Sequence, residues 1–379
     1  MLRAPKRKGI TLLNALFFLF LFSITNISCS TDNLEEVGIV DDETSTDEPE
    51  SPENPENTED SDDSNSPETM EFEENFVLDE DMKLVNFVLS DTEYNKFITD
   101  DGDLKMVSKK VYEYFNDEFD FIFVLSVEES QPQNLYYGIS YKVKNDVEGI
   151  GSSIYDGTSQ YGSDGKLKSV IYMPRTEYIV SGPFLHEIAH YWANHGFLST
   201  TVGGHWGYSS AGGQLGGFDE LDDLGGGTYH GKVNGRNGFG ANANGGNSLP
   251  YSNVELYVMG LIGKDELESI QVAENPVSTG EYGKFTADGI TTLTSADLVT
   301  EHGERIPSVQ NSQKEFNALT VIISTSKLGQ EKIDSINKDL ENFSRKGEPD
   351  SYWGDTYNFW KATGERASIT IQVSNGDIK

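Results

Sequence analysis

The sequence predicts an α+β fold for the part of the chain that follows a long acidic N-terminal segment. Between residues 106 and 373, strand-like and helix-like patterns succeed one another irregularly. Such an order favours a mixed sheet with helices packed on it over regular βαβ repeats. The stretch His186-Glu187-Ile188-Ala189-His190 lies among apolar residues, as a helix buried against a sheet requires. We therefore expect one α+β domain at residues 73–379, with a functional helix and a C-terminal α/β part at about 276–379.

Residues 1–28 have the features of a bacterial lipoprotein signal peptide. A basic start precedes an apolar run at residues 10–24, which is too short and too close to the N-terminus to favour a permanent membrane span. Cys29 is the one cysteine of the chain, and its setting resembles a lipobox, with Asn26 in place of the usual aliphatic residue. We expect a lipid on Cys29 and no disulfide within the chain. Ordinary signal cleavage that leaves a free thiol is the alternative.

Residues 29–72 are expected to form a disordered acidic tether. From residue 30 to residue 82 the chain has no Lys or Arg and is rich in Asp, Glu, Pro and Ser. Such a composition cannot bury enough apolar surface to offset its chain entropy. An acidic stretch after a lipidated cysteine resembles the surface-export signal of Bacteroidetes-type lipoproteins, which implies a lipid anchor in the outer membrane and exposure at the cell surface. The net charge of −35 argues against a nucleic-acid partner.

Five segments of the first half of the domain have clear periodicity. Residues 106–115 carry apolar side chains at helical spacing, and residues 119–126 form a continuous apolar run typical of a buried strand. Residues 135–143 alternate in polarity, and residues 167–173 form a strand of mixed polarity after a glycine-containing turn. The apolar residues between 179 and 192 suit a buried helix for the His-Glu pattern, with Pro183 in its first turn.

The second half begins with a segment that has no clear period. Residues 200–247 are rich in Gly, Asn and Asp, and long ordered loops of this kind are usually functional. The rest is predicted to contain a helix at 251–261, a hairpin-like stretch at 280–293 and a short helix from 295. A strand at 316–323, an amphipathic helix at 328–343, a last helix at 352–362 and a strand at 367–373 follow.

The spacing of His186 and His190 indicates a metal site. Residues four apart on a helix share a face, so the two imidazoles can bind one Zn²⁺ ion. Glu187 lies between them and can reach a water molecule on that ion. The alternative is a helix with two ordinary histidines. A catalytic zinc ion needs a third protein ligand and an open coordination position.

Two residues compete for the third ligand position. His205 lies in a glycine-rich loop that can fold back on the helix, and Trp206 can hold its ring. Glu255 opens a later helix, where a carboxylate also suits the helix dipole. We favour His205, because the flanking glycines let the loop adjust to the metal, and keep Glu255 as the alternative. His195 would lie about 180° around a continuing helix from His186, so we expect it to be exposed near the helix end.

Three blocks of the sequence, at 186–192, 204–208 and 251–261, match three motifs of one group of proteins in the same order. Together they resemble an uncharacterised group of secreted bacterial zincin-like proteins with the motifs H-E-x-x-H-x-W, G-x-H-W and Y-S-x-(L/V)-(D/E)-x-Y-(L/V)-M-G-L. The resemblance implies a zincin-like metallopeptidase domain with one catalytic zinc ion. The chain departs from metzincin sites, because Ala193 and Gly196 stand where a glycine and a third histidine are needed.

The expected reaction is hydrolysis of a peptide bond. Glu187 acts as general base toward the attacking water and then protonates the leaving amine. Tyr251, Tyr257 and His230 are the candidates for stabilising the oxyanion of the transition state. The strand 167–173 precedes the helix, and the resemblance to zincins implies that an edge strand at this place pairs with an extended peptide.

The sequence also bounds the partners. We expect a protein or peptide substrate, a membrane contact through the lipid anchor, and a monomer. Asp219, Asp222 and Asp223 are candidates to cap turns or to bind a Ca²⁺ ion. The alternative function is a non-catalytic surface lipoprotein that binds a protein or a glycan through its Gly-, Asn- and Tyr-rich loops. The presence of Glu187 favours catalysis over this binding module.

Overall fold

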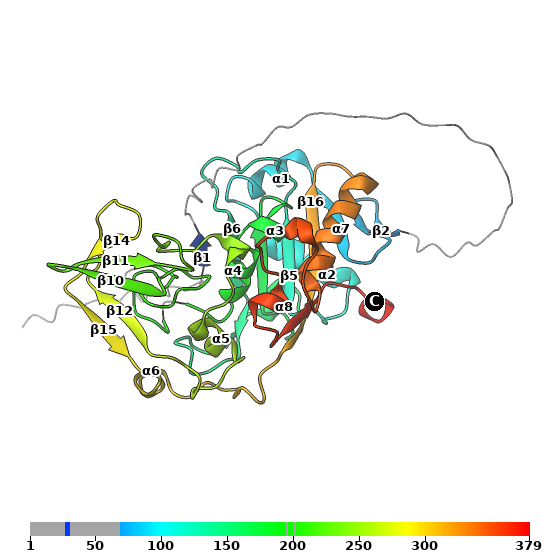
Figure 1. Cartoon of the computed structure of the whole chain (residues 1–379). Coiled ribbons are helices and arrows are strands. Elements are labelled where there is room, and N and C mark those ends of the chain that lie inside the picture. Colours follow the sequence, from blue (N-terminus) through cyan, green and yellow to red (C-terminus); the bar gives the residue numbers. More distant parts are fainter. Residues whose placement is uncertain (1–26, 31–68, 195, 201) are drawn as a thin grey trace, which may run out of the picture.

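The computed structural model describes residues 27–30, 69–194, 196–200 and 202–379 (Figure 1). Most of the predicted signal peptide, residues 31–68 of the predicted tether, and His195 lie outside the described residues. Among the helices that are described, none combines the length and the apolar character that crossing a bilayer requires.

The main sheet has nine strands of mixed direction. Strands β9, β5, β16 and β4 run parallel to one another in its centre, and β6 and β3 flank them in the antiparallel direction. The order across the sheet is β1 (Ile27–Ser30), β6 (Gly138–Lys142), β9 (Ser169–Met173), β5 (Phe121–Leu125), β16 (Glu315–Ser324), β4 (Leu84–Val88), β3 (Phe76–Leu78) and β2 (Met70–Glu73), with β17 (Ser368–Thr370) paired to β16. The predicted α+β class with a mixed sheet is confirmed.

Helices pack on both faces of this sheet (Figure 1). Alternate residues of β5 point to opposite faces, so that Phe121 and Phe123 belong to one core and Ile122 and Val124 to the other. The second core is closed by α1 (Asp91–Phe97) and α2 (Leu104–Tyr114). The first is closed by α3 (Tyr178–Ser181), α4 (Phe184–Ala189), α5 (Asn253–Met259), α7 (Gln330–Ser344) and α8 (Phe359–Ala362).

A smaller lobe of short strands lies beside the main sheet, at the left of Figure 1. One sheet contains β10 (Glu220–Gly225), β11 (Thr228–Lys232), β14 (Lys284–Thr286) and β13 (Val277–Ser278), and a second pairs β12 (Ile270–Glu274) with β15 (Gly289–Leu293), which α6 (Ser295–His302) follows. This lobe has a small hydrophobic core of its own, which includes Phe218, Phe239 and Phe285. A separate pair, β7 (Lys144–Asn145) with β8 (Tyr155–Asp156), lies before β9 in the chain.

Several expectations are corrected by the structure. The segment 200–247 contains the hairpin β10–β11, which the sequence hides because the side chains of β10 are almost all exposed and show no alternation. The stretch 280–293 is not a hairpin, because β14 joins β11 and β13 whereas β15 joins β12. The segment 352–362 is not one helix; a 3-10 turn and α8 are separated at Gly354, which has a φ of 58°.

The strand 167–173, expected at the sheet edge, lies inside the sheet. Its core β9 is fully buried and has β6 and β5 as neighbours. The edge nearest α4 is formed by β6, on which β1 lies in antiparallel pairing. At the other end, β2 already belongs to the sheet, so the folded part begins a few residues before residue 73.

Candidate metal centre

Helix α4 places His186 and His190 on one side of a short, fully buried turn. Phe184, Leu185 and Ile188 pack into the core under the sheet, which fixes the rotation of the helix about its axis. The helix ends at Ala189, but His190 keeps helical dihedrals, with φ of −59° and ψ of −16°. The spacing of four residues therefore still corresponds to one helical turn, and both rings face the same way.

A second element brings His205 to these two rings. The chain turns back through Gly204, whose φ is +76°, and the indole of Trp206 is fully buried. Trp206 donates from Nε1 to the carbonyl of Asn194 at 2.7 Å and from its backbone N–H to Leu215 at 2.8 Å. Trp206 thus anchors the loop on both sides, and the ring of His205 is held above α4.

The three imidazoles converge through their Nε2 atoms. The Nε2 atom of His186 lies 3.0 Å from that of His190 and 3.3 Å from that of His205. Two ligands ~2.0–2.1 Å from a tetrahedral zinc ion are about 3.3 Å apart. The spacing of the three nitrogens thus fits one common ion. In the part of the chain that the structure describes, this trio is the one group of three or more His, Cys, Asp or Glu residues that could hold a metal.

Backbone carbonyls set the orientation of these rings. The Nδ1 atom of His186 lies 2.6 Å from the carbonyl of Gln214, and that of His205 lies 2.8 Å from the carbonyl of Gly203. Since a carbonyl only accepts, Nδ1 carries the proton in both rings and Nε2 is the unprotonated nitrogen. This is the outer-shell arrangement typical of metal-binding histidines.

Burial keeps two of the histidines neutral. It lowers the pKa of His186 to about 3, with the neighbouring His205 acting in the same direction and the hydrogen bond to Gln214 acting against it. Burial also lowers the pKa of His190 well below its usual value, and its two histidine neighbours add to the effect. A neutral imidazole is the form that binds a metal, so these ligands are ready at neutral pH.

Glu187 is buried beside the trio with no partner of its own. Its relative exposure is 0 %, and neither carboxylate oxygen has a hydrogen-bond partner among the described residues. Burial alone raises its pKa well above the usual range. Gly138 of β6 packs against it; a Cβ there would lie 2.7 Å from both Cγ and Oε1 of Glu187. The missing side chain of Gly138 makes the space that the carboxylate fills.

The structure places Glu255, the alternative ligand, away from the trio of Nε2 atoms. It is the third residue of α5, and its relative exposure is 0 %. Its Oε1 accepts from the backbone N–H of Leu215 at 2.8 Å, and its Oε2 accepts from that of Ser252 at 2.7 Å. Burial raises its pKa, and these backbone hydrogen bonds oppose that rise. Both oxygens are thus committed to backbone donors.

The candidates for oxyanion stabilisation lie elsewhere. The hydroxyl of Tyr251 donates to the carbonyl of Leu185 at 2.9 Å, which fixes the start of α4 from behind. Tyr257 is buried against Phe197, with ring centroids 5.8 Å apart. His230 is on β11 in the small lobe, and its Nε2 lies 3.2 Å from the carbonyl of Asn237. None of these contacts directs the side chain toward the three histidines.

The acids considered for calcium have local roles. Asp219 accepts from the backbone of Asn234, and Asp223 accepts from that of Gly225, each at 2.8 Å. Asp222 pairs with Lys232 at 2.7 Å, which lowers the pKa of this exposed carboxyl. These contacts are turn and hairpin interactions.

The backbone of Cys29, the predicted lipidation site, lies in β1.

Residues that sequence reasoning missed hold the site together. Gln214 contributes through its backbone carbonyl, for which no sequence signal exists. Asn247 accepts from the N–H of Leu185 at 3.0 Å and donates to the carbonyls of Ile179 and Val180, which fixes the start of α4. A buried asparagine with three such bonds lies in the Gly- and Asn-rich segment, whose composition was the available signal.

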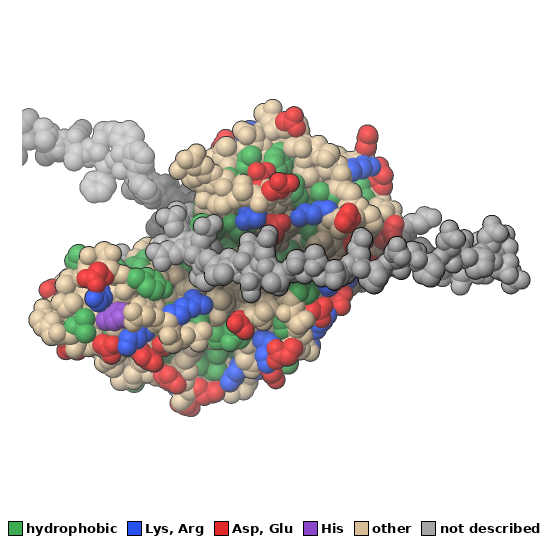
Figure 2. Space-filling view, turned by 45° about the horizontal axis from the view of Figure 1, so that its top comes forward, with side chains coloured by type: hydrophobic (Ala, Val, Ile, Leu, Met, Phe, Trp, Pro, Cys, Tyr) green, Lys and Arg blue, Asp and Glu red, His purple; other side chains and the backbone are tan. Residues whose placement is uncertain are grey.

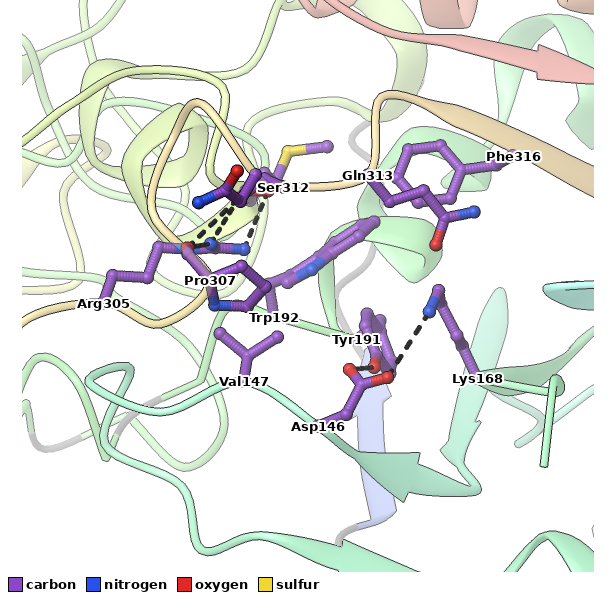
Figure 3. A pocket seen from close by; sticks show the side chains of 12 residues that line it. Asp146, Val147, Lys168, Tyr191, Trp192, Arg305, Pro307, Ser312, Gln313 and Phe316 are labelled. Carbon is purple, nitrogen blue, oxygen red and sulfur yellow. Dashed lines mark hydrogen bonds and ion pairs between the residues drawn. The ribbon is translucent and has the colours of Figure 1, made fainter.

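A cavity of about 210 Å³ lies past the C-terminal end of α4 (Figure 3). Tyr191 and Trp192 line it, together with Lys168 and Arg305. The hydroxyl of Tyr191 donates to Asp146 at 2.7 Å, and Lys168 lies 3.8 Å from the same carboxylate. The three histidines and Glu187 are not among the lining residues, so this cavity is separate from the metal centre.

Comparison of the chain with family models, with curated proteins and with solved structures finds no match.

Proposed function

We propose that this protein is a zinc-dependent metallopeptidase, with His186, His190 and His205 as metal ligands and Glu187 as general base. One observation carries the proposal: the fully buried carboxyl group of Glu187, which has no hydrogen-bond partner among the described residues, directly follows His186, one of three buried histidines whose rings converge. A structural carboxylate at such a place would be paired, because burying an unpaired one is costly. Three nitrogen ligands with an acid beside them suit a catalytic ion with an open position.

The residues present fit the expected ion. Zinc favours imidazole nitrogen, and the Nε2 spacing of 3.0 and 3.3 Å agrees with ligands around one tetrahedral ion. When bound, the ion supplies Lewis-acid chemistry, which acidifies water and polarises a carbonyl group. A cation held by these histidines would also favour the ionised form of Glu187, against the effect of burial.

Glu187 then moves the proton of the reaction. A carboxylate oxygen accepts a proton from the water molecule whose oxygen attacks the carbonyl carbon of the peptide. The same carboxyl group returns the proton to the nitrogen atom as the carbon–nitrogen bond breaks, which leaves one carboxylic acid and one amine. Gly138 keeps the carboxylate of Glu187 in place during both transfers, because it packs directly against the side chain.

The side of β6 on which β1 pairs supports a peptide as substrate. Gly138, which touches Glu187, is the first residue of β6, and the strand lies at the side of the sheet where α4 packs. In the structure, β1 pairs antiparallel with this edge, from Ile27 opposite Tyr141 to Ser30 opposite Gly138. An extended peptide in place of β1 would run past Glu187. Cleavage before Cys29 would leave two of the four residues of β1 on the chain.

The surface supports a protein substrate over a nucleic acid. On the face shown in Figure 2, Lys and Arg side chains are interspersed with Asp and Glu. Together with the net charge of −35, this distribution gives a polyanion no continuous basic surface to bind on that face.

The lipid anchor remains part of the proposal, and Cys29→Ser should move the protein from the membrane fraction to the soluble fraction. Unchanged membrane association of the variant would remove the anchor from the proposal.

The decisive experiment is cleavage of a mixed peptide library by the mature protein. We expect cleavage that a chelator stops and added zinc restores. Glu187→Gln should keep the metal and lose turnover by roughly 10²–10⁴-fold, because the general base is gone. His230→Ala, outside the site, is the matched control and should cleave like wild type. Zinc binding without any cleavage by the wild type would contradict the peptidase and favour a binding module.

A further inference from the structure

We propose that Glu255 is a positioning residue for the metal centre, which holds the carbonyl of Gln214 against Nδ1 of His186. The inference rests on the proposed metal site and adds to it a residue outside the ligand set. Its basis is a continuous chain of contacts: the carboxylate of Glu255, the loop 213–215, the carbonyl of Gln214, and the ring of His186.

The first contact joins α5 to the loop. The Oε1 atom of Glu255 accepts from the N–H of Leu215, one residue beyond the carbonyl that His186 uses. The Oε2 atom accepts from the N–H of Ser252, at the start of the same helix. The carboxylate thus bridges two backbone segments, and the loop takes its position from the first turn of α5.

The second contact removes the space in which the loop could shift. A Cβ on Gly213 would lie 2.2 Å from Oε2 of Glu255 and 2.5 Å from Oγ of Ser252. From the other side, Nδ2 of Asn244 donates to the carbonyls of Gly213 and Gly217, at 3.0 and 2.9 Å. The backbone around Gln214 is therefore fixed on both sides, and its carbonyl has one direction to point in.

The last contact reaches the metal ligand. The Gln214 carbonyl lies 2.6 Å from Nδ1 of His186, and this hydrogen bond selects the tautomer whose Nε2 lone pair faces the other two rings. An outer-shell bond of this kind orients the ring and raises its basicity as a ligand. Displacement of the loop would allow the ring of His186 to rotate or to change tautomer.

The chemistry requires a carboxylate at residue 255. Each oxygen of Glu255 accepts from a backbone N–H group, so the side chain must present two acceptor atoms. A glutamine has the same shape but offers one acceptor and one donor, and its amide nitrogen would face an N–H group. Glu255→Gln therefore breaks one of the two bridging bonds with almost no change in volume.

The test measures zinc affinity by chelator competition in the mature protein, for wild type, Glu255→Gln and Gly213→Ala. Both variants should bind zinc roughly 10–100-fold more weakly, the range expected for loss of an outer-shell partner. In the zinc-loaded variants, the ¹⁵N shifts of the His186 ring should also show a mixture of tautomers. A role limited to folding stability would move neither quantity in the folded protein.

Asp79→Asn is the matched control. Asp79 is also buried and accepts from backbone N–H groups, those of Lys83 and Leu84 at 2.8 Å each, but it lies between β3 and β4, away from α4. This variant should lose stability and keep wild-type zinc affinity. Wild-type affinity in Glu255→Gln and Gly213→Ala would overturn the inference and leave the zinc site standing. Absence of zinc binding by the wild type would overturn both. If Glu255→Gln fails to fold, Gly213→Ala decides alone, because it keeps the charge of Glu255 and disturbs only the contact between its carboxylate and the loop.

Discussion

Glu187 follows His186 in the chain and Glu255 is linked to it through the loop 213–215, and the two glutamates differ in one respect that separates their roles. Glu187 and Glu255 are both fully buried, and each lies against a glycine, Gly138 and Gly213, whose absent side chain makes room for the carboxylate. Both oxygens of Glu255 accept from backbone N–H groups. In contrast, neither oxygen of Glu187 has a partner among the described residues. The carboxylate of Glu255 therefore holds two backbone segments together, whereas the carboxyl group of Glu187 can bind a water molecule or a substrate.

A reactive acid is distinguished from a structural one by its hydrogen-bond partners. A carboxylate whose two oxygens both accept from backbone N–H groups is a weaker base and is held in one orientation, so it is poorly placed to take up a proton or to bind a metal. An unpaired one costs folding free energy, which a protein tolerates mainly at functional sites. Residue type and burial are the same in both cases, so the hydrogen-bond partners carry the distinction.

The largest expected effect concerns the ligand set. If three histidines suffice and Glu255 is not a ligand, His205→Ala should weaken zinc binding by more than roughly 100-fold, beyond the loss of any outer-shell partner. Equilibrium dialysis with zinc analysis measures this, with His230→Ala as control. A His205→Ala protein that still binds zinc like wild type would break the comparison, because the ligand would then have to come from elsewhere.

The next effect concerns the space in front of Glu187. A methyl group at residue 138 would overlap the side chain of Glu187, so Gly138→Ala should displace the carboxylate without touching a metal ligand. We expect turnover to fall by roughly 10–100-fold, since a displacement of about 1 Å can cost that much, while zinc affinity stays unchanged. Ser140→Ala, on the same strand, is the control. Loss of zinc together with turnover would mean that Gly138 supports the helix and not the acid.

Stability sharpens the comparison further, because the two glutamates predict opposite signs. At neutral pH in the zinc-free protein, burial opposes the ionisation of Glu187, so Glu187→Gln, which has no ionisable group, should raise the free energy of unfolding by about 1–3 kcal/mol. Glu255→Gln breaks a charged hydrogen bond and should lower it by about 1.5–3 kcal/mol. Urea unfolding in excess chelator measures both. If both variants change the free energy of unfolding in the same direction, the difference in hydrogen-bond partners does not determine the stability contribution of the two glutamates.

How much of this was predictable from sequence depends on the kind of signal. The helix at 106–115, the buried strand at 119–126 and the strand at 316–323 have patterns set by their own burial, and each is confirmed as α2, β5 and β16. The hairpin β10–β11 was missed because its exposed side chains carry no period. The pairing of β14 and β15 with different partners depends on contacts distant in sequence, which local pattern does not contain.

The site divides along the same line. Local spacing was enough to predict that His186 and His190 share one side of a helix, and the glycines around His205 correctly indicated a loop that could return to α4. The role of Glu187 stays a prediction. The role of Gln214 acts through a backbone carbonyl, which any residue type could supply. Glu255 looked like a ligand because its position at a helix start gives no information on which donors its oxygens meet.

A third carboxylate, Asp146, tests the electrostatic side of the comparison and gives the smallest effect. Burial would raise its pKa, but Lys168, Lys144 and the hydroxyl of Tyr191 outweigh burial and bring it to about 2. A folded pKa below the unfolded value stabilises the protein above about pH 4, and the contribution is lost as pH falls from about 4 to 2. The side chain is 48 % exposed, so solvent screening limits the gain to ~1 kcal/mol. Asp146→Asn should therefore be less stable than wild type at pH 6, with the difference vanishing near pH 2 and shrinking in high salt. A difference that is the same at both pH values would assign the role of Asp146 to its hydrogen bond with Tyr191 and not to its charge.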